Sequence, residues 1–175
     1  MPKIIENVRE SLIAEARKQV LESGYSTLSI RAVAKACGIA TGTVYNYFES
    51  KEVLVASFMT EDWQKAVNTM KNHCRNETNA INVLSTIHEE LVAFISAKQP
   101  LFNDPQAGAI FNTSGRKFHG MLISQLMEIA GPVCSAAAKN KEVPVAEFAL
   151  ETLLLWTLQG KSFSDYISII SGLFQ

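Results

Sequence analysis

The fold is decided by residues 29–52, which read SIRAVAKACGIATGTVYNYFESKE. In the first half, four apolar residues follow the helical spacing i, i+3, i+4 and i+7, namely Ile30, Val33, Ala34 and Cys37. Ser29 precedes them, where a serine caps a helix, and Gly38 follows them, where a left-handed residue is favoured. Arg31 and Lys35 share a different face. The pattern therefore predicts a short helix that ends at Gly38.

A second short helix is predicted over residues 41–48, with Val44 and Phe48 as its apolar anchor. The other positions are small, hydroxylated or carry an amide, namely Thr41, Gly42, Thr43, Tyr45, Asn46 and Tyr47. Two short helices joined by a glycine-containing turn form a helix-turn-helix. Small residues allow such a helix to approach a surface closely, and the polar groups can donate to phosphates or base edges. The pattern therefore indicates a DNA-binding element.

Ser50 is positioned to cap a third helix, with Lys51 in its first turn. A helix N-terminus with a lysine beside it is a phosphate-binding site. Two other interpretations stay open at this point. Tyr45 and Tyr47 can be ordinary packing residues, and Lys35 can belong to a solvated face.

The rest of the chain shows helical spacing of apolar residues and no sustained alternation typical of strands. Helices are predicted over residues 4–23, 54–70, 80–97, 117–130, 144–158 and 164–173. Gly24 is expected to end the first of these, and Gly131-Pro132 to interrupt the fourth. The predicted fold class is all-α, with an N-terminal three-helix helix-turn-helix domain followed by a C-terminal helical bundle domain.

The composition suits a soluble globular protein: 175 residues, 47% hydrophobic and 19% charged, with a formal net charge of -1. The three cysteines, Cys37, Cys74 and Cys134, are odd in number and widely spaced, which favours a reducing compartment over a disulfide framework. No apolar run approaches the roughly 20 residues that span a membrane. The first residues lack the apolar core of a signal peptide. We therefore expect a cytoplasmic protein without a membrane partner.

Residues 27–54, TLSIRAVAKACGIATGTVYNYFESKEVL, closely resemble the DNA-binding motif of the TetR family of transcriptional regulators. The matching elements are a threonine before the first helix, an Ile-Ala core, a glycine in the turn, Gly-Thr-(apolar)-Tyr-x-Tyr-Phe, and Ser-Lys-Glu-x-Leu. Ala32 and Ala40 depart from the family, which often has an acidic residue and a serine cap there. The detailed resemblance covers about the first third of the chain.

The resemblance implies a DNA-binding domain over residues 1–50 and an effector-binding and dimerisation domain over residues 51–175. The implied contacts to bases are Arg31, Thr41, Gly42, Thr43 and Asn46, and the implied contacts to phosphates are Thr27, Tyr45, Tyr47 and Lys51. The implied function is sequence-specific binding to a palindromic double-stranded operator, as a repressor that a small apolar or amphipathic effector releases. A helix-turn-helix regulator controlled without a small ligand is the alternative. An enzyme on a helical scaffold is a third class, but the sequence shows no convergent acid-base or metal constellation.

Candidate effector-pocket residues are large apolar side chains of the long helices, namely Trp63, Phe94, Phe111, Met121, Met127 and Trp156. Such residues are more often simply part of a core. The histidines His73, His88 and His119 and the cysteines show no close ligand spacing such as CxxC or HxxxH, so we expect no metal and no cofactor.

A homodimer is predicted from the last third of the chain. Residues 148–158, FALETLLLWTL, are apolar around more than one face, and a second apolar strip follows in the terminal helix. Two such helices from each protomer would bury both strips in a four-helix interface. The predicted interface residues are Phe148, Leu155, Ile167, Ile170 and Phe174. Gly160 either allows close helix approach or marks a local kink. The other interpretation is that these faces pack inside one subunit.

Overall fold

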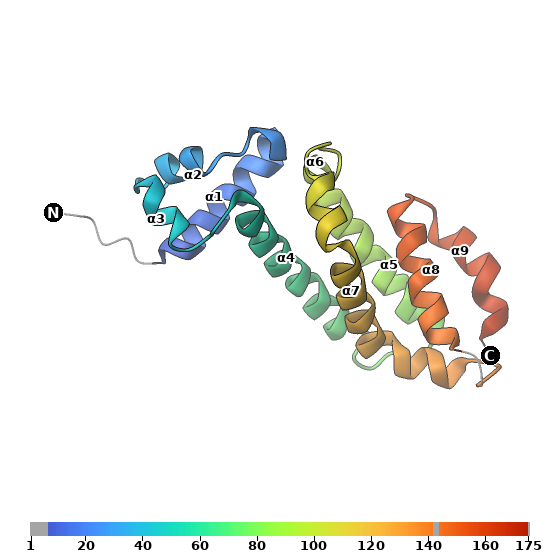
Figure 1. Ribbon diagram of the computed structural model, residues 1–175. Helices are drawn as coiled ribbons and strands as arrows, with labels where there is room; N and C mark the ends of the chain where they lie inside the picture. Colours follow the sequence, from blue (N-terminus) through green and yellow to red (C-terminus); the bar gives the residue numbers. More distant parts are fainter. Residues whose placement is uncertain (1–6, 142–143, 175) are drawn as a thin grey trace. The chain divides into compact units, whose positions relative to one another are not determined.

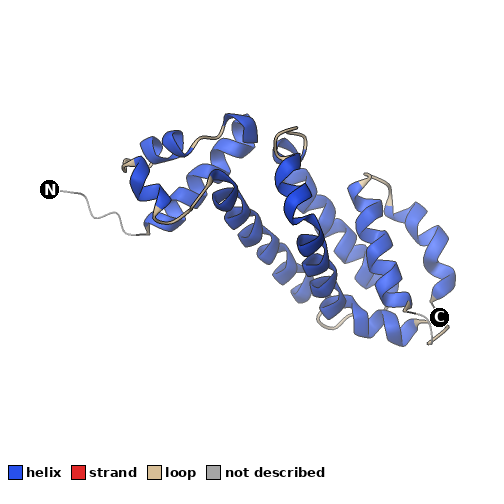
Figure 2. Ribbon diagram, in the orientation of Figure 1, coloured by secondary structure: helices blue, strands red, loops and turns tan. Residues whose placement is uncertain are grey.

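The computed structural model describes residues 7–141 and 144–174, and the side chains of these residues outside 108–117. The helices are α1 (Val8–Ser23), α2 (Ile30–Ala36), α3 (Thr41–Tyr45), α4 (Lys51–Cys74), α5 (Ala80–Ala97), α6 (Gln99–Phe102), α7 (Gly108–Ala137), α8 (Val145–Leu158) and α9 (Phe163–Ile170), with two 3₁₀ turns, η1 (Tyr25–Thr27) and η2 (Ser171–Leu173) (Figure 1). The described residues contain no strand, so the predicted all-α class is confirmed (Figure 2). The predicted helix start at Ile4 lies outside the described residues.

The chain divides into two compact units. Unit 1 comprises residues 1–62 and 98–113, and unit 2 comprises residues 63–97 and 114–175. Unit 1 therefore runs beyond the predicted boundary at residue 50 and includes a segment that is distant in the sequence. Helices α4 and α7 each contribute residues to both units.

Unit 1 is built on an amphipathic α1. Leu12, Ala16 and Val20 follow a spacing of four residues and are fully buried, as their positions in the sequence predict. Gly24 ends the helix in a left-handed conformation with φ 84°, and its N–H donates to the Val20 carbonyl oxygen over 2.9 Å. Because a side chain is strained at positive φ, this position favours glycine. The predicted helix end is therefore confirmed.

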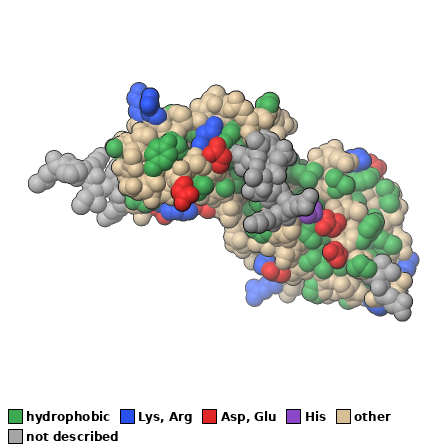
Figure 3. Space-filling model, in the orientation of Figure 1, with side chains coloured by type: hydrophobic (Ala, Val, Ile, Leu, Met, Phe, Trp, Pro, Cys, Tyr) green, Lys and Arg blue, Asp and Glu red, His purple; other side chains and the backbone are tan. Residues whose placement is uncertain are grey.

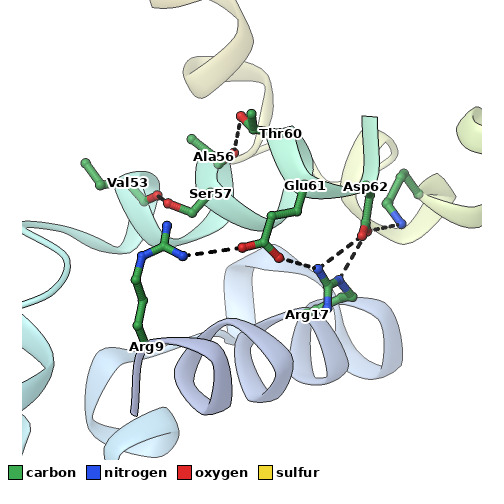
Figure 4. A network of polar contacts seen from close by, with 9 residues as sticks. Arg9, Arg17, Val53, Ala56, Ser57, Thr60, Glu61 and Asp62 are labelled. Carbon is green, nitrogen blue, oxygen red and sulfur yellow. Dashed lines mark hydrogen bonds and ion pairs between the residues drawn. The ribbon is translucent and has the colours of Figure 1, made fainter. Parts of the chain in front are cut away.

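A buried ionic cluster fixes the segment that begins at Lys98 within unit 1. Lys98 Nζ lies 2.7 Å from Asp62 Oδ2, and Arg17 binds the same carboxylate through Nε at 3.1 Å and through NH2 at 3.0 Å. Arg17 also reaches Glu61, which accepts from Arg9 at 3.5 Å (Figure 4). The Asp62 carboxylate therefore joins α1, α4 and the start of α6.

The core of unit 2 is formed by the second half of α4, by α5, by the second half of α7 and by α8, with α9 packed on α8 and α5. Buried side chains from α5 meet Ala149, Leu150 and Leu153 of α8. One polar pair lies in this apolar layer: His88 Nδ1 is 2.9 Å from Thr157 Oγ1, and Thr157 donates to the Leu153 carbonyl oxygen over 2.8 Å. Because the threonine proton is already used, His88 is the donor, which fixes its Nδ1–H tautomer.

Helix α5 is 18 residues long with a mean hydropathy of 1.2, so its length and composition alone would permit a membrane span. Val83, Leu84, Ile87 and Leu91 of α5 are buried in the core of unit 2. Core packing therefore accounts for its apolar character.

The prediction that Gly131-Pro132 interrupts a helix was wrong. Helix α7 continues to Ala137 with Pro132 inside it. A proline in a helix interior costs about 3 kcal/mol because its N–H is missing and its ring clashes with the preceding turn. Ala130 and Cys134 on the flanking turns are fully buried, so packing on the core of unit 2 offsets this cost. A Cβ at position 131 would lie 3.2 Å from Met127 Cε, so Gly131 leaves room for that side chain.

Candidate nucleic-acid interface

The helix-turn-helix begins with a capped helix. Ser29 has an extended backbone, and its Oγ accepts from the Ala32 N–H over 3.1 Å, as the sequence predicts. At the other end, Gly38 adopts φ 69°. Its N–H donates to the Lys35 carbonyl oxygen, and the Ile39 N–H donates to the Ala34 carbonyl oxygen over 3.0 Å. This pair of bonds is the Schellman motif, which turns the chain sharply from α2 into α3.

Helix α3 is anchored by Val44, with 0% of its surface exposed, and by Phe48 just beyond its end, with 2% exposed. The predicted anchor pair is therefore confirmed. Ala40 at the N-cap makes no side-chain hydrogen bond, also as the sequence predicts. The last turn is closed by backbone bonds from Tyr47 and Phe48 to the Val44 carbonyl oxygen, at 3.0 and 2.9 Å.

The outer face of α2 and α3 presents the predicted contact residues to solvent. Arg31, Gly42, Tyr45, Asn46 and Tyr47 are exposed, and Thr41 and Thr43 are half-buried. Both tyrosines are about half exposed, at 52% and 46%, so neither ring serves the core. Their interpretation as ordinary packing residues does not fit this exposure.

Charge and space on this face favour a polyanion. No Asp or Glu occurs between Glu22 and Glu49, so the charges of α2 and α3 are the cations Arg31 and Lys35. Elsewhere charges of both signs are interspersed over the visible surface, in keeping with the formal net charge of -1 (Figure 3). A Cβ on Gly42 would meet nothing within 4 Å, so no contact inside the protein requires glycine there.

Lys51 occupies a defined place at the start of α4. Its Nζ donates to the Tyr25 carbonyl oxygen over 3.2 Å and lies 3.8 Å from the centroid of the Tyr25 ring. Ser50 Oγ accepts from the Val53 N–H over 3.3 Å, so the predicted cap is confirmed. An ammonium group has three donors, and two remain for other acceptors. The predicted phosphate contact of Lys51 stays a prediction, and the lysine also has a structural role.

The hydroxyl of Thr27 is already engaged. Its single proton is shared between the carbonyl oxygens of Ser23, at 3.1 Å, and Gly24, at 2.9 Å. Phosphate is an acceptor, so the predicted phosphate contact requires this hydroxyl to leave its internal bonds.

Two carboxylates that sequence reasoning missed hold the turn η1 before α2. Tyr25 Oη donates to Glu52 Oε1 over 2.7 Å, and this bond lowers the pKa of Glu52. Burial, followed by the same bond, raises the pKa of Tyr25. Asp104 accepts from the Ser26 N–H over 2.7 Å and from the Ser26 hydroxyl over 2.6 Å, and these bonds lower its pKa. The helix-turn-helix is thereby tied to α4 and to the loop after α6.

The predicted effector residues do not form one group. Trp63 and Phe94 meet edge to face, with ring centroids 5.4 Å apart and planes at 77°. Met121 and Met127 are six residues apart on α7, which places them about 120° apart around the helix. Trp156 lies in the last turn of α8, and its Nε1 donates to the carbonyl oxygen of Ser162 beyond the helix end. The side chain of Phe111 lies outside the described residues.

One polar residue joins the Trp63–Phe94 pair without having been predicted. Trp63 Nε1 donates to Gln125 Oε1 over 2.5 Å. The position of Gln125 on an apolar helix face is a sequence signal, but nothing in the sequence indicates its partner, Trp63, which is 62 positions away.

The predicted dimer residues separate into two sets. Phe148 and Leu155 are exposed, at 52% and 58%, and Ile167 is half-buried. Ile170 and Phe174 are only 3% and 4% exposed and belong to the core of unit 2, so their placement on an interface needs correction. The chain end turns back onto α7, where the Lys139 N–H donates to the Leu173 carbonyl oxygen over 2.9 Å, and this buries the two side chains.

Two further apolar residues are exposed on α8 and α9, namely Leu158 on α8 at 56% and Ile169 on α9 at 66%. Gly160 adopts φ 68°, and a Cβ there would meet nothing within 4 Å. It therefore serves the turn between α8 and α9, and no part of the same chain described by the structure packs closely against it.

Comparison with known proteins agrees with this geometry. The model of the family described as bacterial regulatory proteins, tetR family, matches residues 12–58. The transcriptional regulator UidR of Escherichia coli K12 is 23% identical over 83% of this chain, and the chain spans 64% of the length of that relative.

Two of the solved structures that share the fold illustrate the similarity. The fatty acid degradation regulator FadR from Bacillus halodurans has a TM-score of 0.58 and 19% identity over 98% of this chain and 96% of its own. RolR in complex with resorcinol has a TM-score of 0.63 and 18% identity over 95% of this chain and 86% of its own.

Proposed function

We propose that this chain, whose N-terminal domain belongs to the TetR family of bacterial regulatory proteins, is a sequence-specific DNA-binding transcriptional regulator. In this proposal it acts on chromosomal DNA in the cytoplasm as a homodimer, and a small apolar or amphipathic molecule releases it from its operator. The proposed function includes no catalysed reaction.

The observation that carries the proposal is the exposed face of α2 and α3. Val44 and Phe48 hold α3 from behind, while Arg31, Asn46 and the two tyrosines point away from the core. Arginine and asparagine side chains bind guanine and adenine edges in the major groove through paired hydrogen bonds, whereas tyrosine hydroxyls suit phosphates. The absence of carboxylates between Glu22 and Glu49 lowers the repulsion from a phosphate backbone.

A second copy of the chain is the proposed partner of the exposed apolar strip. Phe148, Leu155 and Leu158 lie seven and three residues apart on α8, which puts them on one face. Ile169 of the neighbouring α9 adds to it. A single short recognition helix reads few base pairs, and two copies on a two-fold axis would read a palindrome with half-sites about one helical turn apart.

The apolar interior of unit 2 supports a small-molecule effector. The half-buried Phe94, which packs on Trp63, offers aromatic surface, and Gln125 adds a polar group bonded to the same tryptophan. RolR, which shares the fold, is described in complex with resorcinol, a small aromatic molecule. The alternative is a regulator controlled without a small ligand. The burial of Trp63 favours this alternative, because a side chain that is 1% exposed is packed like an ordinary core residue.

The test is selection of random DNA duplexes by the full chain, followed by electrophoretic mobility shifts with the enriched sequences. We expect one inverted repeat to emerge and to bind with steep salt dependence, because phosphate contacts release counterions. Enrichment of no sequence after repeated rounds would overturn the proposal.

A further inference from the structure

The side-chain amide of Gln125 has a fixed orientation. The indole Nε1–H of Trp63 is a donor only, and Gln125 Oε1 accepts it over 2.5 Å. The oxygen must therefore face Trp63, and the Nε2 group with its two protons must face away. Trp63 is 1% exposed and is held by Phe94 edge to face, so the whole arrangement is rigid.

The two Nε2 donors are available to a ligand. In the described part of the chain, Gln125 Nε2 makes no hydrogen bond. Every side-chain nitrogen or oxygen there that is shielded from solvent does have a hydrogen-bond partner. The Nε2 atom is therefore reachable from outside the protein. Gln125 itself is half-buried.

Most side chains one helical turn from this amide on α7 are apolar: Met121, Leu122 and Ile129 are half-buried and packed against the core of unit 2. The remaining neighbour, Glu128, is exposed and forms an ion pair with Lys71. Phe94, next to Trp63, is half-buried as well. A neutral donor in such a place suits an uncharged acceptor, because a carboxylate taken from water without a cation would cost far more free energy.

We propose that Gln125 selects the effector, and that the effector is a mainly apolar molecule with an uncharged hydrogen-bond-accepting oxygen, such as a ketone or an ester. The apolar part lies against Phe94, Met121 and Leu122, and the oxygen accepts from Gln125 Nε2. This inference rests on the effector-binding part of the proposed function.

Three probes of similar shape separate the possibilities: 4-phenyl-2-butanone carries a ketone, n-butylbenzene carries no acceptor, and 4-phenylbutyrate carries a charge. In a Trp156→Phe background Trp63 is the sole tryptophan, so its fluorescence reports binding directly. We expect the full chain to bind the ketone about fivefold or more tightly than the hydrocarbon, since one neutral hydrogen bond contributes on that order. The carboxylate should bind most weakly.

Gln125→Glu is the matched variant, measured at about pH 9, because an apolar site raises the pKa of a carboxyl group and the test needs the ionised form. Its carboxylate still accepts from the Trp63 indole but offers no donor. We expect the ketone-to-hydrocarbon affinity ratio to fall to about one, a change that loss of structural support alone would not cause. Gln125→Leu, which removes both roles, should give the same ratio with a lower melting temperature.

An unchanged ratio in Gln125→Glu would overturn the inference, and so would failure of all three probes to bind at millimolar concentration. Mobility shifts with the selected operator, in the absence of probe, keep the two proposals separate. Intact operator binding without ketone selection refutes only the role of Gln125. Ketone selection without operator binding refutes only the regulator.

Discussion

Lys98 Nζ lies 2.7 Å from Asp62 Oδ2, and the two side chains are only 8% and 12% exposed. The lysine begins the segment of residues 98–113, which belongs to the same compact unit as the helix-turn-helix. Arg17 of α1 shares the carboxylate. The nearly buried Asp62 carboxylate, bound by Lys98 and Arg17, therefore holds this distant segment to α1 and α4.

Asp62→Ala should destabilise the protein by about 3 kcal/mol, because it removes the carboxylate that the buried Lys98 and the half-buried Arg17 share. Urea unfolding measures the loss. Lys71→Ala is the control, since its ion pair with Glu128 is 45% and 59% exposed and should contribute less than about 1 kcal/mol. Equal losses in the two variants would show that burial of the Asp62 cluster is energetically unimportant.

Arg31→Ala and Lys51→Ala should fail in different ways. Loss of Arg31 should relax preference at one base position, at a cost of about 1–3 kcal/mol, and leave the melting temperature unchanged because the side chain is exposed. Loss of Lys51 should weaken binding to all sequences and flatten the salt slope by about one unit. It should also lower the melting temperature, because Tyr25 loses its ammonium partner.

A panel of operator variants, titrated at several salt concentrations, distinguishes the two changes. Similar profiles for both variants across that panel would refute the division between base and phosphate contacts.

Stability should fall as the pH drops below about 6.5, because burial lowers the pKa of His88 and the unfolded chain then binds more protons than the folded one. The loss of stability begins near the pKa of His88 in the unfolded chain and is complete once the pH lies below its pKa in the folded protein. His88→Asn removes the titrating group and keeps a donor for Thr157. Thermal melts of both proteins between about pH 5 and pH 8 should show a smaller acid loss in the variant. If the melting temperatures of both proteins fall equally with decreasing pH, another group is responsible for the acid loss.

Leu155→Glu combined with Ile169→Glu should yield a folded monomer. Both side chains are exposed in the single chain, so the change should not disturb its fold. In the proposed dimer, the new carboxylates would be buried without a cation, which disfavours association. Light scattering gives the mass and circular dichroism the helix content. Ile170→Glu should instead unfold unit 2, since Ile170 is 3% exposed. A dimer that survives the double change would refute this interface.

Features governed by neighbouring residues could be predicted from the sequence. The Ser29 cap, the Gly38 turn and the Val44–Phe48 anchor all depend on spacings of a few residues, and all three are confirmed. Helix α5 begins and ends at the predicted residues, Ala80 and Ala97, because a strong apolar period defined it.

Features that join distant residues could not be predicted. Asp104 meets Ser26 across 78 positions and Gln125 meets Trp63 across 62, and polar residues of this kind are common on any helical surface. The break expected at Pro132 failed for the related reason that tertiary packing outweighed a local rule. Ile170 and Phe174 looked like interface residues because their own chain's core was invisible in the sequence.

The central claim is sequence-specific DNA binding by the face of α2 and α3. Its most direct measurement is the ratio of dissociation constants for the selected operator and for a random duplex, by fluorescence anisotropy at one physiological salt concentration. We expect the operator to bind about a thousandfold or more tightly. Arg31→Ala should reduce that ratio. Equal affinity for the two duplexes, in a protein that remains folded, would contradict the account.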